Sequence, residues 1–262
     1  MSDRPSRQES ARLLRQRLEM GAGELFLERM TRAEALAILS SPRIADAGSL
    51  VSGNVGAEPA ATVKTPDDQL PVLPDDHGAL RDMALACTRC RLSQGRTQVV
   101  FSDGPRDARL MVVGEAPGAN EDSTGVPFVG AAGKYLDVLL STVGLGREDT
   151  VYIANVLKCR PPGNRDPKPD EIEACSPYLK KQIELVRPEA LLAVGSFAGK
   201  LLTGREKSSL GKLRGEVHSY LGVPLVVTYH PAALLRNPRW TRPFWEDLQL
   251  LRDVMDASRA SK

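Results

Sequence analysis

The sequence predicts an α/β fold in which helices cover both faces of a parallel sheet. Four short runs of aliphatic residues recur between residues 110 and 229, and each is nearly continuously apolar. Such runs are typical of strands buried on both faces. Longer stretches with helical spacing of their apolar residues separate the runs, which is the order that parallel strands require. At 262 residues, the chain has room for one such domain and an appendage.

The predicted strands are each followed by a turn or a polar segment, and they lie at residues 110–114, 151–157, 190–195 and 223–229. Helices are expected between and after them, at residues 130–143, 169–186, 197–202 and 240–255. Pro169 and the acidic residues after it favour a helix N-terminus, and Ser196 can cap the helix that follows it. In such a sheet, ligands bind at the carboxyl ends of the strands.

The first 79 residues differ from the rest and are expected to form an N-terminal extension. Residues 8–40 interleave leucines with Arg and Glu, which predicts one or two surface helices. Residues 41–78 are rich in Ala, Gly, Pro and Val without a sustained period, which predicts a flexible, disordered linker. The compact body is therefore expected at residues 80–262, and the extension is a candidate binding site for a protein partner.

The composition argues against a membrane protein and suits an anionic partner. No apolar run approaches the length that spans a membrane, and no apolar signal core follows Met1. We therefore expect a cytoplasmic protein without a membrane partner, and we expect it to be a monomer. The first 80 residues hold 9 Lys and Arg against 12 Asp and Glu, whereas the rest holds 26 against 21. This mildly basic body suits nucleic acid.

The four cysteines form two pairs, Cys87 with Cys90 in a C-x2-C and Cys159 with Cys175 further along. In a reducing cytosol, paired cysteines are more often metal ligands than disulfides. Two such pairs can make one four-thiolate site, which fits either tetrahedral zinc or an iron–sulfur cluster. These residues alone leave that choice open.

Small and acidic residues follow the first predicted strand. Gly114-Glu-Ala-Pro-Gly118 permits a sharp turn and a close approach of the backbone to a ligand, although the motif alone is a weak signal. Glu121 and Asp122 would repel a phosphate, so a neutral ligand or a cationic transition state fits better. Phe128 precedes the first helix of the body, where it is either a core residue or a flat platform for a planar base.

Polar residues also follow the second and fourth strands. The amide of Asn155 presents a donor and an acceptor side by side, which suits one edge of a pyrimidine, and tethering of the loop is the alternative. His230 stands where ligand sites form in this fold, with structural hydrogen bonding as the alternative. Leu234 and Arg236 follow, either as the first turn of a helix or as an apolar wedge with a cation for phosphates.

Taken together, these motifs resemble a known family. They are similar to the family-4 uracil-DNA glycosylases, the iron–sulfur members of the uracil-DNA glycosylase superfamily. The likeness runs from about residue 80 to residue 255, and it rests on Cys87-x2-Cys90, Gly114-Glu-Ala-Pro-Gly118, Pro127-Phe-Val-Gly130, Asn155-Val-Leu-Lys-Cys159-Arg-Pro-Pro, Cys175 and His230-Pro-Ala-Ala-Leu-Leu-Arg236. No single motif is decisive, but their order and spacing together are specific.

The resemblance implies an αβα sandwich with a central four-stranded parallel sheet. It also implies a [4Fe–4S] cluster, whose ligands would be Cys87, Cys90, Cys159 and Cys175. Phe128 would stack on a uracil flipped out of DNA, Asn155 would read the pyrimidine edge, and His230 would contact uracil O2.

Further positions carry implied roles in the same family. The pocket would be lined by Glu115, Ala116, Pro117 and Asn164. Glu115 and Glu121 would be catalytic or water-positioning carboxylates. Leu234 would be the wedge in the minor groove, and Arg236 would contact DNA.

The implied activity is hydrolysis of the N-glycosidic bond of uracil in single- and double-stranded DNA, the first step of base excision repair. The residues agree with a monofunctional enzyme, since we identify no pocket lysine as a nucleophile and the loop at residues 163–169 has no histidine. One alternative is a zinc-stabilised nucleic-acid-binding domain without catalysis. The other is a related glycosylase acting mainly on hypoxanthine or xanthine. Glu115 and Asn155 favour uracil, because members with broader substrates lack one or the other.

Overall fold

The computed structural model describes residues 72–260, and its compact body starts at Leu73. Most of the expected N-terminal extension therefore lies outside the described residues. The first described helix, α3 (His77–Leu85), begins before residue 80 and buries Leu80 in the core. A division of the chain after residue 79 would cut through this helix.

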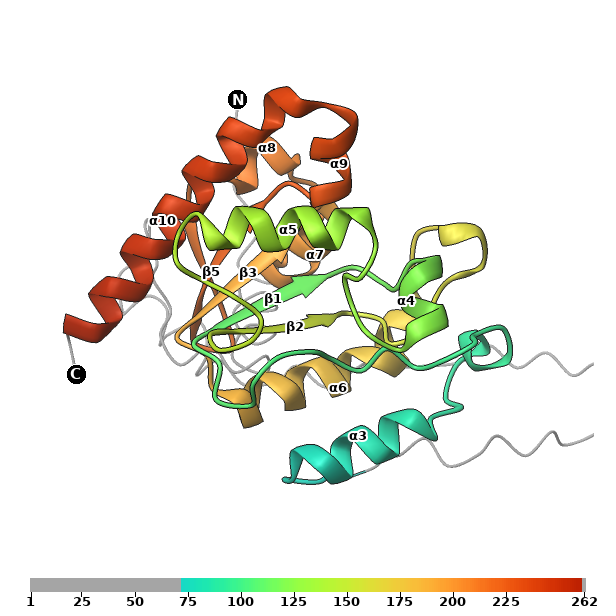
Figure 1. The fold of residues 1–262 in the computed structure, drawn as a ribbon. Coiled ribbons are helices and arrows are strands. Elements are labelled where there is room, and N and C mark those ends of the chain that lie inside the picture. The colour runs from blue at the N-terminus through green and yellow to red at the C-terminus, as the bar shows by residue number, and fades with distance from the viewer. Residues whose placement is uncertain (1–71, 261–262) are drawn as a thin grey trace, which may run out of the picture. The chain divides into compact units, whose positions relative to one another are not determined.

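A five-stranded sheet forms the centre of the body. Its strands are β1 (Leu110–Gly114), β2 (Val151–Asn155), β3 (Ala190–Val194), β4 (Val217–Tyr220) and β5 (Val223–Thr228). They lie in the order β2-β1-β3-β5-β4, with β1, β2, β3 and β5 parallel (Figure 1). These four are the predicted parallel strands.

The expectation of only four strands was wrong, because β4 adds a fifth at one edge of the sheet. This strand pairs with β5 in the antiparallel direction, and a tight turn at Leu221 and Gly222 joins the two strands. Its residues alternate between exposed and half-buried positions. This strand lacks the continuous apolar run that predicts the four parallel strands.

Helices and short 3-10 turns connect the strands. The α-helices after α3 are α4 (Ala119–Thr124), α5 (Ala131–Ser141), α6 (Pro169–Val186), α7 (Ser196–Thr203), α8 (Leu210–Leu213), α9 (Pro231–Arg236) and α10 (Thr241–Ala260). The 3-10 turns are η1 (Arg91–Gln94), η2 (Pro162–Asn164) and η3 (Pro238–Trp240). Among the described residues, no helix is both long and apolar enough to cross a membrane.

The helices form a layer on each face of the sheet. Leu110 and Val112 of β1 pack on one face with α5, α9 and α10, whereas Met111 and Val113 pack on the other with α3, α6 and α7. This division follows from the alternation of side chains along a strand. Figure 1 shows α5 and α6 on opposite sides of the strands. The α/β layering predicted from the sequence is therefore confirmed.

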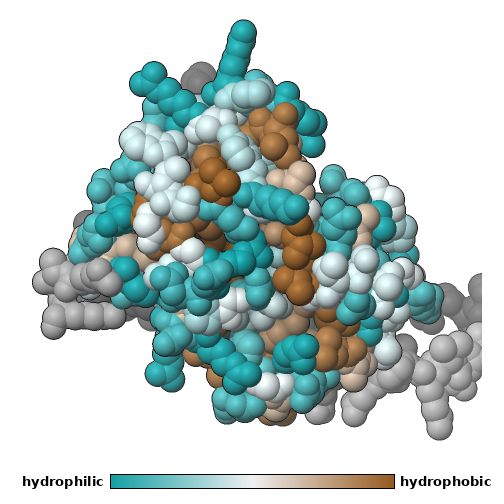
Figure 2. Space-filling model, in the orientation of Figure 1, coloured by the Kyte–Doolittle hydropathy of each residue, from teal (hydrophilic) through white to brown (hydrophobic). Residues whose placement is uncertain are grey.

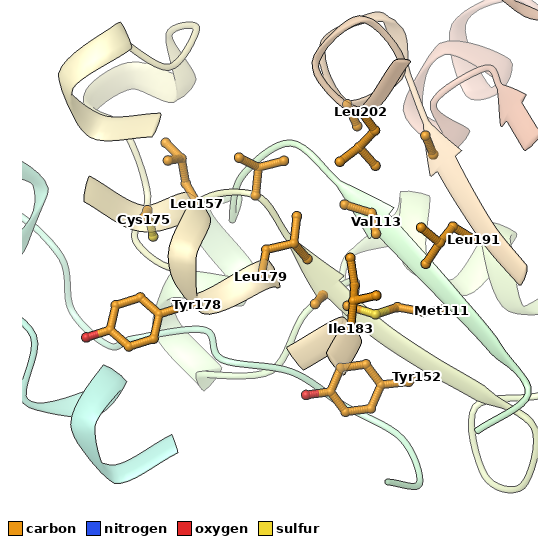
Figure 3. Close-up of a cluster of buried hydrophobic side chains, with 14 of the residues drawn as sticks. Met111, Val113, Tyr152, Leu157, Cys175, Tyr178, Leu179, Ile183, Leu191 and Leu202 are labelled. Atoms are coloured by element: carbon orange, nitrogen blue, oxygen red, sulfur yellow. The ribbon is translucent and has the colours of Figure 1, made fainter. Parts of the chain in front are cut away.

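The core under α6 extends to the cysteines. Figure 3 shows Tyr178, Leu179 and Ile183 along α6, and Cys175 lies one turn earlier beside Leu157. Leu157 comes from the segment that follows β2, and it is fully buried. The packing of α6 on the sheet thus places a cysteine next to the chain that leaves β2.

Candidate active site and cysteine pocket

The carboxyl ends of β1 and β2 meet without space for a side chain between them. Gly114 is paired with Asn155 in the parallel register. A Cβ atom on Gly114 would lie 2.3 Å from Asn155 Oδ1 and 2.8 Å from the ring of Phe128. Glycine is required here because any side chain would displace the amide and the ring. The structure therefore brings Asn155 and Phe128, both predicted from the sequence, to the same point.

Asn155 is a buried amide with a free acceptor. Its exposed fraction is 2%, and among the described residues no group donates a hydrogen bond to Oδ1. A buried polar atom without a partner is costly, so it indicates a ligand that would supply the missing bond. A ligand that fits here must present a hydrogen-bond donor to Oδ1, such as the N–H of a pyrimidine.

The rings of Phe128 and His230 stack against each other near the carboxyl ends of the strands. Their ring centroids are 5.6 Å apart and their planes differ by 30°. Phe128 has a φ of 53°, which is unusual for an aromatic residue. The loop after it is held by Glu121, whose Oε1 accepts hydrogen bonds from the backbone N–H groups of Val129 and Gly130, both at 3.0 Å.

His230 caps α9, and this contact fixes the position of its proton. Nδ1 accepts a hydrogen bond from the backbone N–H of Ala232 at 3.2 Å. The proton of the neutral imidazole therefore lies on Nε2, which remains a donor. Burial, with a smaller contribution from the nearby charge of Arg236, lowers the pKa of His230 to about 4. At neutral pH the ring is thus an uncharged donor.

The turn after β1 holds the other predicted pocket residues of that strand. Pro117 is buried, whereas Glu115 and Ala116 are half-buried. Burial raises the pKa of the Glu115 carboxyl, and the negative charge of Asp166 adds to this effect. Asn164 is exposed in η2, and its Oδ1 accepts a hydrogen bond from Arg160 Nε at 2.7 Å. The described contacts therefore place Asn164 on the loop surface.

The predicted wedge, Leu234, lies inside the protein. Its exposed fraction is 1%, and it packs in the core with α10. The next residue, Leu235, is 49% exposed, and Arg236 is exposed beside it. Figure 2 shows the face of the molecule that is seen in Figure 1, where apolar groups appear in small areas among polar side chains. Of the two leucines, Leu235 is the one that is free to reach a partner.

The four cysteines line one pocket. Cys87, Cys90, Cys159 and Cys175 are all free thiols, and they are joined there by Arg96, Lys158 and Tyr178. Arg96 Nη1 donates to Cys159 Sγ at 3.3 Å, and the backbone N–H of Lys158 donates to Cys175 Sγ at 3.2 Å. Hydrogen bonds of this kind are common at metal-bound sulfur and help to set its properties.

The four thiols together form a possible metal-binding donor set. Within the part of the chain that the structure describes, no three His, Cys, Asp or Glu side chains are arranged to hold a single ion. Zinc, at about 2.3 Å from each sulfur, would need the four sulfurs about 3.8 Å apart. Four thiols around a common pocket are a donor set that can hold one zinc ion or a cluster with one cysteine per metal.

Lys158 connects the cysteine pocket to Asn155. Its side chain is 2% exposed in the fold, and Nζ donates to Asn155 O at 2.8 Å and to Gln182 Oε1 at 2.5 Å. Burial lowers the pKa of Lys158 to about 8. A buried amino group of this kind needs polar partners. It obtains one of them from the backbone of Asn155, so Asn155 and the cysteine pocket share a support.

Sequence reasoning missed three residues at these sites. Lys158 was read only as part of a motif, although its place between Asn155 and Cys159 is a usable signal. Leu235 has the same side chain as its neighbour Leu234, and only burial distinguishes the two. Arg147 donates to the carbonyls of Phe128 and Pro127, and nothing in the sequence around it indicates this.

Comparisons with known proteins agree with this geometry. The sequence profile of the uracil DNA glycosylase superfamily matches residues 101–249. A type-4 uracil-DNA glycosylase of Sulfurisphaera tokodaii is 44% identical over 67% of this chain and 83% of its own length. Those of Saccharolobus solfataricus and Thermotoga maritima are 41% and 48% identical, over 70% and 58% of this chain and 88% and 79% of their own. The chain therefore belongs to the uracil-DNA glycosylase superfamily, among the type-4 enzymes.

Proposed function

We propose that this protein hydrolyses the N-glycosidic bond between uracil and deoxyribose in single- and double-stranded DNA. Its membership of the family supports the reaction class, since the relatives are named uracil-DNA glycosylases. The single observation that carries the base specificity is the buried Asn155 amide, whose Oδ1 has no partner beside the Phe128 ring. Hydrolysis releases the base and leaves an abasic site, which makes it the first step of base excision repair.

The base is recognised after it leaves the double helix. Phe128 supplies a flat surface on which the uracil ring stacks, and such stacking does not require a specific base. Asn155 supplies the selection, because Oδ1 accepts from uracil N3–H and the amide N–H₂ donates to the carbonyl beside it. Cytosine has a free acceptor at N3 and would leave the buried oxygen unpaired, which is the costly outcome.

His230 stabilises the leaving group. Cleavage of the glycosidic bond leaves negative charge on uracil, and the neutral Nε2–H of His230 donates to O2 as this charge develops. One preorganised donor of this type contributes about 3 kcal/mol in transition-state stabilisation. The bond from Ala232 to Nδ1 keeps the imidazole in the required tautomer before substrate arrives.

Glu115 is the better candidate for the carboxylate that faces the sugar. The sugar acquires oxocarbenium character, which a nearby negative charge stabilises, and the same carboxylate can orient the attacking water. Glu121 was the other candidate, but its Oε1 already binds two backbone amides of the loop after Phe128. We assign Glu121 to positioning and Glu115 to chemistry, with water as the acceptor of the sugar.

A [4Fe–4S] cluster is the group proposed for the cysteine pocket. Cys87, Cys90, Cys159 and Cys175 would each bind one iron. When bound, the cluster would supply a rigid cross-link between the three segments of the chain that carry these cysteines. Lys158 and Arg96 stand beside the sulfurs as hydrogen-bond donors. The pocket therefore has a structural role in this proposal.

DNA is the partner, and Leu235 with Arg236 forms the proposed contact. An apolar side chain that enters the base stack keeps the flipped base from returning, and a nearby cation binds phosphate. Leu235 takes the wedge role that the resemblance gave to Leu234, because only Leu235 is exposed. We further propose that the protein acts in the cytoplasm as a monomer, with the N-terminal extension open to a protein partner.

Side-by-side excision assays test the function. The full chain is incubated with oligonucleotides that carry uracil, thymine, hypoxanthine or xanthine, in single- and double-stranded form. Uracil is expected to be released fastest, and Asn155→Ala should lower both the rate and the preference for uracil. Faster release of hypoxanthine or xanthine would contradict the substrate assignment. Zinc in place of iron and sulfide in the purified protein would contradict the cluster.

A further inference from the structure

Phe128 is held in a backbone conformation that it would not adopt by itself. Its φ of 53° lies in the left-handed region, where a bulky side chain is an outlier. Such conformations persist only where the surrounding structure imposes them, and they concentrate at functional sites. The direction of the Phe128 ring therefore depends on whatever fixes the backbone around it.

Arg147 fixes both peptide groups that flank the Cα atom of Phe128. Nη1 donates to Pro127 O at 3.3 Å, and Nη2 donates to Phe128 O at 3.0 Å. The first carbonyl belongs to the peptide group whose rotation sets φ, and the second to the one whose rotation sets ψ. One guanidinium thus restrains both torsions of the same residue, which a lysine with its single nitrogen could not do in this form.

The second peptide group is also held from its other end. Its carbonyl is Phe128 O, and its N–H is that of Val129, which donates to Glu121 Oε1 at 3.0 Å. Gly133 leaves the space for this arrangement, because a Cβ atom there would lie 1.7 Å from Phe128 O. Arg147 and Glu121 therefore bind the two ends of the same peptide unit, and Gly133 leaves the space that this unit occupies.

Two carboxylates orient Arg147 in turn. Asp137 Oδ1 accepts from Nε at 2.9 Å and from Nη2 at 2.8 Å, and Asp103 Oδ2 accepts from Nη1 at 2.9 Å. The backbone of Asp103 pairs with Ile153 in β2, the strand that ends at Asn155. The Arg147 side chain is only 20% exposed. The network consequently connects the Phe128 platform to the strand that carries the base-reading amide.

We propose that Arg147 is a positioning residue for uracil recognition, which acts by holding Phe128 in the orientation that stacks on the base. This inference rests on the proposed function, since it needs Phe128 to be the platform. Arg147 contacts the backbone of Phe128 and not the substrate. Its effect on excision must therefore pass through the Phe128 ring.

The test is a double-mutant cycle measured by single-turnover excision of uracil from a single-stranded oligonucleotide. The four proteins are wild type, Arg147→Met, Phe128→Ala and the double variant. We expect Arg147→Met to lower the rate about tenfold in the wild-type background, because small misplacements of binding groups are costly. In the Phe128→Ala background, the same change should alter the rate by less than about twofold, since the residue through which it acts is gone.

Arg109→Met is the matched control. Arg109 forms a comparable ion pair with Glu189 through Nε and Nη2, and its side chain is 25% exposed. It precedes β1, at the end of the sheet opposite the candidate site. Its replacement should lower thermal stability as Arg147→Met does, with uracil excision unchanged. Arg147→Lys, which keeps the charge but not the fork, replaces Arg147→Met if the latter does not fold.

The possible outcomes distinguish a failure of the proposed function from a failure of the positioning role of Arg147. If Phe128→Ala leaves excision unchanged, the platform assignment in the proposed function fails. If Phe128→Ala impairs excision while the Arg147 variants do not, the positioning role fails. It also fails if Arg147→Met costs as much in the Phe128→Ala background as in the wild type, or if Arg109→Met reduces excision equally.

Discussion

The carboxyl edge of the sheet and the cysteine pocket lie at the two ends of residues 155–159, yet they are held in different ways. At the edge, the chain makes the arrangement with its own groups: Gly114 leaves space, Glu121 binds two backbone amides, and Arg147 binds two carbonyls. These contacts need no bound group. The edge is thus preorganised by the polypeptide, which is what an enzyme requires of a site that stabilises developing charge.

The cysteine pocket, if it holds the proposed cluster, would depend on a group that the chain does not supply. Burial raises the pKa of Cys90 and Cys159, and raises that of Cys175 to about 12. By themselves these side chains are therefore neutral thiols at neutral pH, and they become ligands only when metal replaces their protons. Loss of the proposed cluster should therefore lower stability first, whereas changes at the carboxyl edge should lower the excision rate.

The largest effect is expected from a substitution that removes a thiol from the cysteine pocket. Cys175→Ser should lower the iron content and reduce the free energy of unfolding by about 4 kcal/mol or more, which is typical when a bound metal group is lost. Iron per chain and thermal unfolding measure this. Ser93→Ala is the control, because Ser93 lines the same pocket without a thiol. Wild-type iron content and stability in Cys175→Ser would refute the assignment of Cys175 as a ligand.

The next effect concerns rate alone. His230→Ala should lower the single-turnover rate about a hundredfold while DNA binding persists, because the donor to uracil O2 is removed. His230→Asn should be equally slow but more stable, since an asparagine oxygen can still cap α9. A His230→Asn protein that excises uracil at the wild-type rate would mean that His230 acts only as a cap.

A smaller effect separates the two leucines of α9. Leu235→Ala should slow excision from double-stranded DNA about tenfold and leave single-stranded DNA and stability nearly unchanged, as expected of a wedge. Leu234→Ala should cost about 2–5 kcal/mol in unfolding free energy instead, because it empties a core position. The assignment of the wedge to Leu235 is wrong if Leu235→Ala excises equally well from both forms of DNA.

The smallest effect is a pH dependence that distinguishes the buried His230 from a histidine with an unperturbed pKa. The pKa of His230 is about 4 in the fold against 6.5 when unperturbed, so the unfolded chain binds more protons between these values. The contribution of His230 to stability is therefore complete above pH 6.5 and is lost as the pH falls toward 4. The excision rate should show no titration near 6.5, and a step there would contradict a neutral His230.

Much of the fold and site could be predicted because burial leaves strong patterns. The four parallel strands are nearly all apolar, and Asn155 and His230 stand out at their ends. The rest depended on tertiary contacts. The edge strand β4 has no buried run, Leu234 and Leu235 are identical in type, and Arg147 approaches Phe128 across 19 positions of sequence. No local pattern carries that information.

Residues 155–159 also limit which sequence changes this chain can tolerate. Val156, Leu157 and Lys158 are each buried to 98% or more, and the backbone N–H groups of Val156 and Leu157 bond to the carbonyls of Gly114 and Glu115. The segment therefore acts as a spacer of fixed length between the Asn155 amide and the Cys159 thiol. Substitutions of similar size can be absorbed there, but insertion or deletion of a single residue would separate the two sites.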